Sequence, residues 1–580
     1  MTVRRLVSSH ASALVAITAL GLACAMVVSD SGPNQAAHFA LVRSLAAGTP
    51  EIDPRETIDS AYVDGRFYAA KAPGLAMFTL PWYGALRAAG LQRQSLASDA
   101  GYRHRLWELG LFGTVLPLVA LLVLMTLAAE RVGPGYGAAS AVLVGAGTLL
   151  LPFGTLFFDH ALSAALGFAA FVVLLRARES ARGMLPLAAA GLLAGLAVVV
   201  EFPLAIVAGV LAAYAAAGDR RLLRLLAFGG GVVAGAFPLL AFNTWAFGSP
   251  FTLSYTHALK APVGEGAVVV GANAEGFFGV GWPDPRAALS LLVSEKGLLV
   301  VTPLAVVALV GLPLLWRLGR RAESLVCGAV PLLFLTYNAA YYLPFGGQSP
   351  GPRFLVAALP FLVMPLAAVL RARPLVVAGI GLVSVGVMAL ATITGPLTGV
   401  EYSIGTWLGR LGRGETVETL AGWVGVQPGW VAAVPFVLLL AVACLAALWD
   451  VPLTADWRRD LPLLAGALGA WLLVVLVAPG LHPADEAHQT GAGTLAVLCL
   501  LAVVATALSL SVRSRLALLV LVPAFVLLLP ELDARPRVSL LVTAGALGIA
   551  VLAWRRLARG GIPVLPQPEV APEAEAIVPP

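Results

Sequence analysis

The chain has 580 residues and a net charge of +6, and 59% of its residues are hydrophobic while only 12% are charged. A soluble globular domain carries about a quarter charged residues, so this composition excludes that class and indicates a membrane protein. The positive charge comes almost entirely from arginines in short loops at the ends of apolar runs, where they set topology, so it does not indicate a nucleic-acid partner.

Apolar runs long enough to cross a bilayer recur from residue 12 to residue 554. We therefore predict an all-α polytopic membrane protein with about sixteen transmembrane helices, plus helices that lie on the outer surface. The Ala-, Gly- and Arg-rich composition hints at a bacterial protein. The expected spans are approximately residues 12–29, 106–128, 137–157, 161–176, 184–200, 203–217, 226–246, 298–316, 323–342, 354–371, 374–395, 431–449, 461–479, 491–511, 514–530 and 538–554.

The N-terminal run resembles a secretory signal peptide, because Arg4 and Arg5 precede it. No Ala-x-Ala-like cleavage site follows, so we interpret residues 12–29 as an uncleaved first membrane helix.

Residues 67–90, FYAAKAPGLAMFTLPWYGALRAAG, decide the topology of everything that follows. Only 12 residues separate Gly74 from Arg87, and Pro81 interrupts them, whereas a span needs about 20. If the segment does not cross the membrane, nearly all arginine clusters share the side of the N-terminus, as the positive-inside rule favours. We therefore expect an interfacial helix on the outer surface.

This topology predicts a multi-pass protein of the cytoplasmic membrane with both termini in the cytoplasm. Three long segments, residues 30–105, 247–297 and 396–430, are then expected outside.

Ionisable residues near a bilayer are costly and are therefore candidates for function. Asp30 ends the first span, and the amphipathic helix expected at residues 34–47 carries Asn34 and His38 one turn apart. Lys71 precedes the interfacial helix. Helix capping or interfacial anchoring would be the structural alternatives for these residues.

Four more candidates follow at the expected outer ends of later spans. Asp159 and His160 stand together in FFDHALSA, Glu201 lies between two short spans, and Arg353 starts the tenth span. Arg353 departs from the positive-inside trend, which favours a specific anionic partner over a membrane anchor.

These residues carry a resemblance to the GT-C class of membrane glycosyltransferases, which includes protein O-mannosyltransferases and lipid A aminoarabinose transferases. The matching features occur in order: a first span, an outer helix that ends in Ala-Ala-Gly, Lys-x-Pro at Lys71, Asp159, and the stretch GGQSPGPRFLVAALPFL. The resemblance covers residues 1–375, which we expect to form the catalytic module. Residues 376–560 would be a C-terminal membrane extension, and residues 561–580 a disordered Pro-rich cytoplasmic tail.

The resemblance implies a sugar donor on a polyprenyl phosphate and transfer at the outer face of the membrane. Lys71 and Arg353 would hold the lipid phosphate and stabilise it as the leaving group. Asp159 would position the acceptor, or bind a divalent metal with His160 or His38. No cofactor is certain, and dependence on a metal stays open.

The chain departs from the class at the expected general base. The class has Asp-Glu-x-x-Tyr after the first span, whereas this chain has Asn34-Gln35-Ala36-Ala37-His38, and an amide is not a useful base. Asp30, Asp159 or His38 would replace it, and we favour Asp30 or Asp159. Asn34, His160 and Glu201 are secondary site candidates.

The function we expect is an inverting membrane glycosyltransferase that moves a sugar to a lipid, glycan or protein acceptor whose identity stays open. The alternatives are a transporter or lipid flippase without covalent chemistry, and a non-catalytic relative that binds the same lipid. A transporter predicts charges deep inside spans and symmetric halves, and the sequence shows neither.

Overall fold

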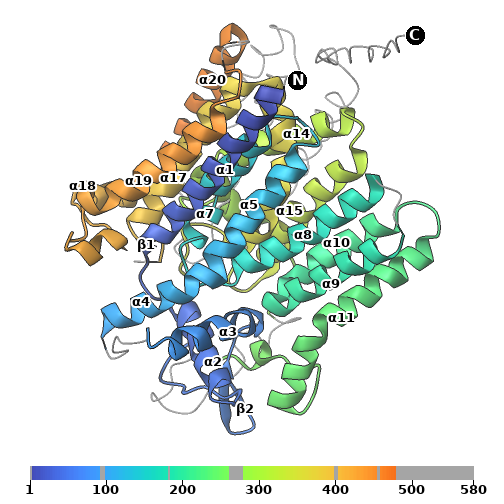
Figure 1. Ribbon diagram of the computed structural model, residues 1–580, viewed down its shortest axis with the longest axis vertical. Coiled ribbons are helices and arrows are strands. Elements are labelled where there is room, and N and C mark those ends of the chain that lie inside the picture. Colours follow the sequence, from blue (N-terminus) through green and yellow to red (C-terminus); the bar gives the residue numbers. More distant parts are fainter. Residues whose placement is uncertain are drawn as a thin grey trace, which may run out of the picture.

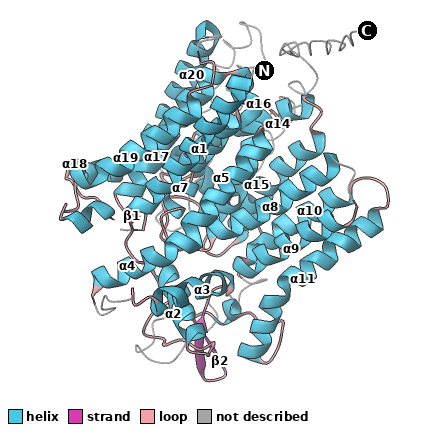
Figure 2. Cartoon of the chain, in the orientation of Figure 1, coloured by secondary structure: helices cyan, strands magenta, loops and turns pink. Residues whose placement is uncertain are grey.

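Helices form nearly all the regular structure in the computed structural model (Figure 2), which describes residues 3–91, 98–179, 183–259, 279–397, 403–453 and 457–477. The expected spans at 491–511, 514–530 and 538–554 lie outside the described residues, as does the tail 561–580. The prediction of an all-α membrane protein is confirmed for the part that is described.

The expected count of sixteen spans is not confirmed. Within the described ranges, eight helices are long and apolar enough to cross a membrane, or nine if one bent pair counts as a single span. The eight are Asp99–Ala129 (α4 Asp99–Gly110, the π-helix η1 Leu111–Val115 and α5 Leu116–Ala129), α8 His160–Glu179, α11 Arg221–Phe247, α15 Arg321–Ala340, Arg353–Ala372 (the 3-10 helix η4 Arg353–Leu362 and α16 Val363–Ala372), α17 Pro374–Ile393, α19 Trp430–Leu448 and α20 Trp457–Val477.

Several expected spans are shorter or broken in the structure. The run 137–157 divides into α6 Gly137–Ala146 and α7 Leu150–Phe153, and the run 298–316 contains the break between the two arms of the pair that is bent by 89°. The remaining helices are α1 Val3–Met26, α2 Pro33–Ala46, α3 Gly74–Ala88, α6 Gly137–Ala146, α7 Leu150–Phe153, α9 Leu185–Val200, η2 Phe202–Leu204, α10 Ala205–Ala216, η3 Ser254–His257, α12 Pro285–Val293, α13 Leu298–Val301, α14 Leu304–Arg317, α18 Ile404–Gly412 and η5 Leu420–Val424.

Glycines allow α9 and α11 to pack backbone against backbone. Gly191 and Gly195 on α9 face Gly231 and Gly235 on α11, and a Cβ added at any of them would fall on the other helix's backbone. Small residues four apart on both helices are the usual means of close packing in membranes. Because α9 ends at Val200, this contact also fixes the start of the next loop.

The two ends of the helix bundle differ in their structure. The N-terminus and α20 lie near one end of the view in Figure 1, and α2, α3 and β2 lie at the other. The described residues form two short antiparallel sheets of two strands each. In one, β1 Val27–Val28 pairs with β4 Glu418–Thr419, and in the other, β2 Ser60–Val63 pairs with β3 Arg66–Ala69.

The three segments expected outside the membrane contact one another. Ala61 bridges to Ala258, and the backbone N–H of Leu259 donates to the carbonyl of Ser60. His104 Nε2 lies 3.0 Å from a carboxylate oxygen of Glu418. The segments therefore share one end of the molecule, while their side of the membrane stays a prediction.

Within residues 67–90 the structure forms one helix, α3, and it is too short to span the membrane. It has 15 residues, which corresponds to about 22 Å and is shorter than the hydrocarbon core. Its first residue, Gly74, lies so close to α9 that a Cβ there would meet the backbone nitrogen of Val200 at 2.6 Å. The short helix is confirmed, and its placement on the outer membrane surface stays a prediction.

Helices beyond residue 375 pack on the N-terminal part. α19 lies along α1, and α17 contacts α6. Asp460 at the start of α20 is fully buried, and its carboxylate accepts from Arg373 at 3.3 Å and from the backbone of Leu375. The described part of the predicted extension is therefore joined to the rest of the bundle, and the division at 375/376 stays a prediction.

Candidate functional site

Most of the predicted site residues gather where α2, the start of α8, the end of α9 and the β2–β3 hairpin meet. Asn34 and His38 lie on α2 and are buried, and His38 is fully buried. Asp159 and His160 are buried at the start of α8, and Glu201 is buried directly after α9. Residues distant in sequence therefore form one buried polar cluster.

Asp159 stands between two histidines. Its Oδ2 lies 3.7 Å from Nε2 of His38, and its Oδ1 lies 3.6 Å from Nδ1 of His160. Neither ring nitrogen of His38 has a hydrogen-bond partner among the described residues. The imidazole of His38 therefore has a free nitrogen near a carboxylate, in a site sheltered from water.

Glu201 brings a second carboxylate to His160. Its Oε1 lies 3.1 Å from Nδ1 of His160, and its Oε2 accepts a hydrogen bond of 2.6 Å from the hydroxyl of Ser163. Ser163 lies one turn after His160 on α8 and was not among the predicted residues.

A divalent cation would fit between Asp159, His160 and Glu201. One ligand atom from each residue lies within 4.8 Å of the others, and Asp159 Oδ1, His160 Nδ1 and Glu201 Oε1 are buried without a hydrogen-bond partner in the described chain. Such orphaned donors and acceptors are costly unless a proton or a metal ion satisfies them. The predicted metal residues Asp159 and His160 thus lie beside a third potential ligand.

Lys71 makes an ion pair that the sequence analysis missed. Its Nζ lies 3.0 Å from Oδ2 of Asp59, and the Lys71 side chain is only 13% exposed. The tight turn of the hairpin, at Asp64 and Gly65, has positive φ at both residues. This turn pairs Ser60 with Ala69, which places Asp59 and Lys71 at adjacent open ends of the two strands.

The hairpin could be predicted from the residues of its turn, Asp64 and Gly65. Asp-Gly between alternating apolar residues is the strongest short-range indication of a two-residue hairpin turn, and the turn length fixes the strand register. That register places Asp59 opposite Ala70, the residue before Lys71, so it predicts that Lys71 is near Asp59 but not that the two side chains pair.

Arg353 begins η4 and has no carboxylate within 4.0 Å among the described residues. Its guanidinium carbon lies 5.8 Å from the ring centre of Phe158 and 5.3 Å from that of Phe354. Its Nε is buried and unpartnered in the described chain. Gly346 leaves room for it, because a Cβ there would meet Nε at 2.6 Å and because its φ of +78° favours glycine.

The carboxylates near these cations are held ionised. Burial raises the pKa of Asp59, but the charges of Lys71, then Arg353 and His38, outweigh it and lower that pKa overall. Burial also raises the pKa of Asp159, and His160, His38 and Lys71 together hold it far below its usual range. Asp59 and Asp159 therefore share a field set by Lys71 and His38.

Asp30 is the predicted site residue whose side chain makes no polar contact with the others in the described ranges. It follows β1, is half-buried, and no hydrogen bond or ion pair joins its carboxylate to another residue in the described ranges. The structure thus brings together seven of the eight predicted residues in one region, with Asp30 outside their contacts.

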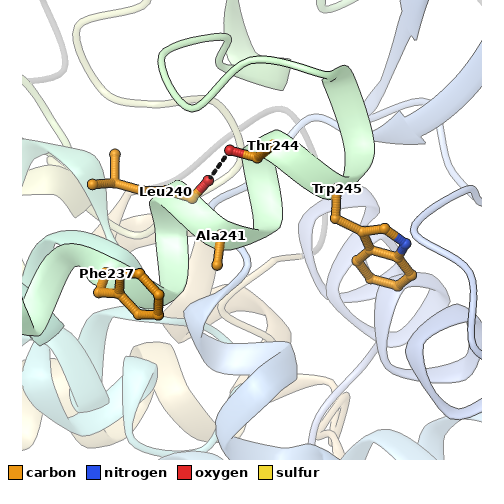
Figure 3. A pocket seen from close by; sticks show the side chains of 5 residues that line it. All are labelled: Phe237, Leu240, Ala241, Thr244 and Trp245. Atoms are coloured by element: carbon orange, nitrogen blue, oxygen red, sulfur yellow. Dashed lines mark hydrogen bonds between the residues drawn. The ribbon is translucent and has the colours of Figure 1, made fainter.

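A separate apolar hollow of about 420 Å³ lies on α11 (Figure 3). It is lined by Phe237, Leu240, Ala241, Thr244 and Trp245. The Thr244 hydroxyl is turned back to the helix, where it donates to the carbonyl of Leu240. The hollow is close to the hairpin, because the hydroxyl of Tyr68 donates to the carbonyl of Ala246 at 3.0 Å.

Comparisons with known proteins give a distant likeness. No protein-family model and no curated protein matches the chain. ArnT from Cupriavidus metallidurans, solved bound to undecaprenyl phosphate, is similar with 16% identity and a TM-score of 0.45, over 88% of this chain and 82% of that chain. The apo oligosaccharyltransferase of Archaeoglobus fulgidus is similar with 14% identity and a TM-score of 0.39, over 83% of this chain and 60% of that chain. Both are GT-C glycosyltransferases, the class that the sequence resembles.

Proposed function

We propose that this protein is a membrane glycosyltransferase whose donor is a sugar on a polyprenyl phosphate. One observation carries the proposal: two cations far apart in the sequence lie beside the buried Asp159 cluster, because Lys71 pairs with Asp59 at 3.0 Å and Arg353 lies 5.8 Å from the ring centre of Phe158, the residue before Asp159. Two cations at one point, next to carboxylates and imidazoles, suit a site that binds a phosphate and moves a proton.

The transfer would be a single displacement at the anomeric carbon. The acceptor oxygen forms a bond to that carbon as the bond to the phosphate oxygen breaks, so the configuration inverts. The phosphate leaves with the electron pair, and Lys71 and Arg353 stabilise the negative charge that it gains.

His38 is the base that the geometry supports best. Both ring nitrogens of His38 are buried without a hydrogen-bond partner in the described chain, so the imidazole can accept a proton, whereas the neighbours of Asp159 hold its pKa far below its usual range. Asp159, 3.7 Å from His38, would stabilise the imidazolium that forms when the acceptor's proton arrives. This assignment removes the need for a carboxylate at Asn34.

A divalent cation held by Asp159, His160 and Glu201 would supply positive charge beside these groups. The residues of the chain would still carry out the steps above: phosphate binding by Lys71 and Arg353 and proton acceptance by His38.

The prenyl chain of the donor would lie in the hollow on α11. That hollow is apolar, and it adjoins the hairpin whose last strand leads directly to Lys71. Prenyl carbons in such a hollow would bury apolar surface while the phosphate stays at the cations.

Native mass spectrometry of the gently purified protein tests the donor assignment. Undecaprenyl phosphate should be retained by the wild type and lost by Lys71→Ala and by Arg353→Ala. Arg87→Ala removes an exposed cation from the last turn of α3, the end of that helix far from Lys71, as a matched control and should retain the lipid. If the wild type binds no such lipid, or if both site variants keep it, the proposal is wrong.

An assay of sugar transfer distinguishes a glycosyltransferase from a protein that only transports the lipid. Membranes that contain the wild type should convert a polyprenyl-phosphate sugar to free polyprenyl phosphate and a glycosylated acceptor, and His38→Gln should bind the lipid without this conversion. Binding and translocation of the intact lipid, with no cleavage by the wild type, would favour the flippase alternative.

A further inference from the structure

Asp59 gives the phosphate site an unusual charge balance. Its carboxylate oxygen lies 3.0 Å from the ammonium of Lys71, and the second proposed phosphate ligand, Arg353, lies 5.8 Å from the ring centre of Phe158, the residue before Asp159. Asp59 therefore places a negative charge directly against one of the two cations that would bind the phosphate. A site intended only to attract phosphate would not hold an ionised carboxylate against its lysine.

We propose that Asp59 shifts the preference of this site from a phosphomonoester towards a phosphodiester, which has one negative charge. The inference rests on the proposed function and adds a specificity-determining residue to it. The donor, a sugar-phosphate-lipid, is a phosphodiester with one negative charge. The product lipid phosphate is a monoester with a charge of about −1.5 to −2 at neutral pH, because its second pKa is about 6.

The discrimination follows from the charges. Asp59 repels the product, with its charge of about −1.5 to −2, more strongly than it repels the donor, which has one negative charge. Asp59 also partly neutralises Lys71, whose attraction for a phosphate likewise grows with the charge of that phosphate. Asp59 therefore favours release of the product lipid after transfer, at the step where strong binding by Lys71 and Arg353 would slow turnover.

Two hydrogen bonds hold the backbone of Asp59 in place, which limits its displacement by a ligand. Its backbone N–H donates to the hydroxyl of Thr57 at 3.0 Å, and its carbonyl accepts from the N–H of Ala70 at 2.9 Å. Both backbone groups are thus fixed at the open end of the hairpin. The carboxylate stays near Lys71 when phosphate arrives, as a resident negative charge must in order to discriminate.

Asp159 is a second carboxylate in the field of Lys71, and it also repels a monoester more strongly than a diester, because the Coulomb energy grows with the charge of the ligand. Asp159 is unchanged in the Asp59 variants. Comparing the wild type with Asp59→Asn therefore isolates the contribution of Asp59.

The test compares two lipids that differ only in charge: undecaprenyl phosphate and its methyl phosphodiester. Their dissociation constants are measured at pH 8 for the full-length protein in detergent, for the wild type, Asp59→Asn and Asp59→Glu. Asp59→Glu should keep the wild-type ratio of the two dissociation constants. Asp59→Asn should shift that ratio about tenfold towards the monoester, mainly by binding the monoester more tightly, since the Asp59 side chain is 33% exposed and partly screened.

Asp53→Asn serves as the control, because it removes a carboxylate from an exposed position of the same outer segment. It should leave the preference unchanged. If Asp59→Asn fails to fold, Asp59→Ser takes its place with the same expected result.

Failure of the inference differs from failure of the proposed function. If both lipids bind the wild type, Lys71→Ala weakens both, and Asp59→Asn keeps the wild-type preference, the role of Asp59 is wrong and the donor site stands. If neither lipid binds the wild type, or if Lys71→Ala changes neither, the donor assignment fails together with the inference.

Discussion

The glycine contact between α9 and α11 predicts a sharp difference between neighbouring substitutions. Gly230 and Gly231 are adjacent on α11, but they face different surroundings. A Cβ at Gly231 would fall on the carbonyl oxygen of Ala188, whereas a Cβ at Gly230 would meet nothing within 4 Å. Gly231→Ala and Gly230→Ala therefore form a matched pair with the same chemical change.

The expected magnitude follows from two opposing effects. Alanine stabilises a helix relative to glycine by about 1 kcal/mol, and this gain applies to both variants. Gly231→Ala also forces the two helices apart, because real Cβ atoms essentially never approach another atom closer than 3.0 Å. Such overpacking costs about 1–3 kcal/mol, so Gly231→Ala should be less stable than Gly230→Ala by about that amount.

Thermal unfolding of the detergent-purified variants, followed by tryptophan fluorescence, measures this difference. We expect Gly230→Ala to unfold at or above the wild-type temperature and Gly231→Ala to unfold below it. Gly195→Ala, on the facing surface of α9, should resemble Gly231→Ala. Equal unfolding temperatures for the adjacent pair would refute the backbone contact between α9 and α11.

Three further results are expected. The pKa of Asp59 is lowered in the folded protein from its ordinary value of 3.8, so the ion pair with Lys71 stabilises the fold above that pH and is lost as the pH falls through the lowered value. The difference in stability between wild type and Asp59→Asn, measured by thermal unfolding, should therefore be present at pH 6 and shrink towards pH 3. Glu201→Gln should weaken Mn²⁺ binding by about tenfold or more in calorimetry, since it removes one of three potential ligands, and an unchanged affinity would place any metal elsewhere. Trp245→Ala should weaken binding of undecaprenyl phosphate several-fold but leave geranyl phosphate unaffected, as a prenyl chain in the hollow on α11 requires.

Composition and apolar run length predicted the class of fold but not the number of spans. The run 137–157 is apolar throughout, yet the structure divides it near Gly147, and Ser384 of α17 lies against that glycine. Hydropathy measures how well a segment tolerates lipid. It does not show whether a neighbouring helix interrupts the segment, which depends on tertiary packing.

Local sequence signals did exist for two features that the sequence analysis missed. Gly191 and Gly195 on one helix, and Gly231 and Gly235 on the next but one, have the spacing that predicts close packing in membranes. Asp64-Gly65 predicts the hairpin that brings Asp59 to Lys71. The hairpin and the close packing of the two helices were therefore predictable from short motifs, whereas the ion pair itself was not, because the register places Asp59 opposite Ala70.

The partners within the polar cluster were not predictable in this way. Asp30 is eight residues from His38 and was a leading candidate for the base, yet Asp159, more than a hundred residues away, is the carboxylate that lies beside His38. Distance along the chain favours Asp30, but α2 turns its buried face toward the start of α8, and that orientation follows from the packing of several helices. Once His38 and Asp159 are adjacent, an imidazole can accept the proton and a low-pKa carboxylate can stabilise it. The amide at Asn34 is therefore compatible with transfer, because the base need not be the acidic residue that the resemblance implies.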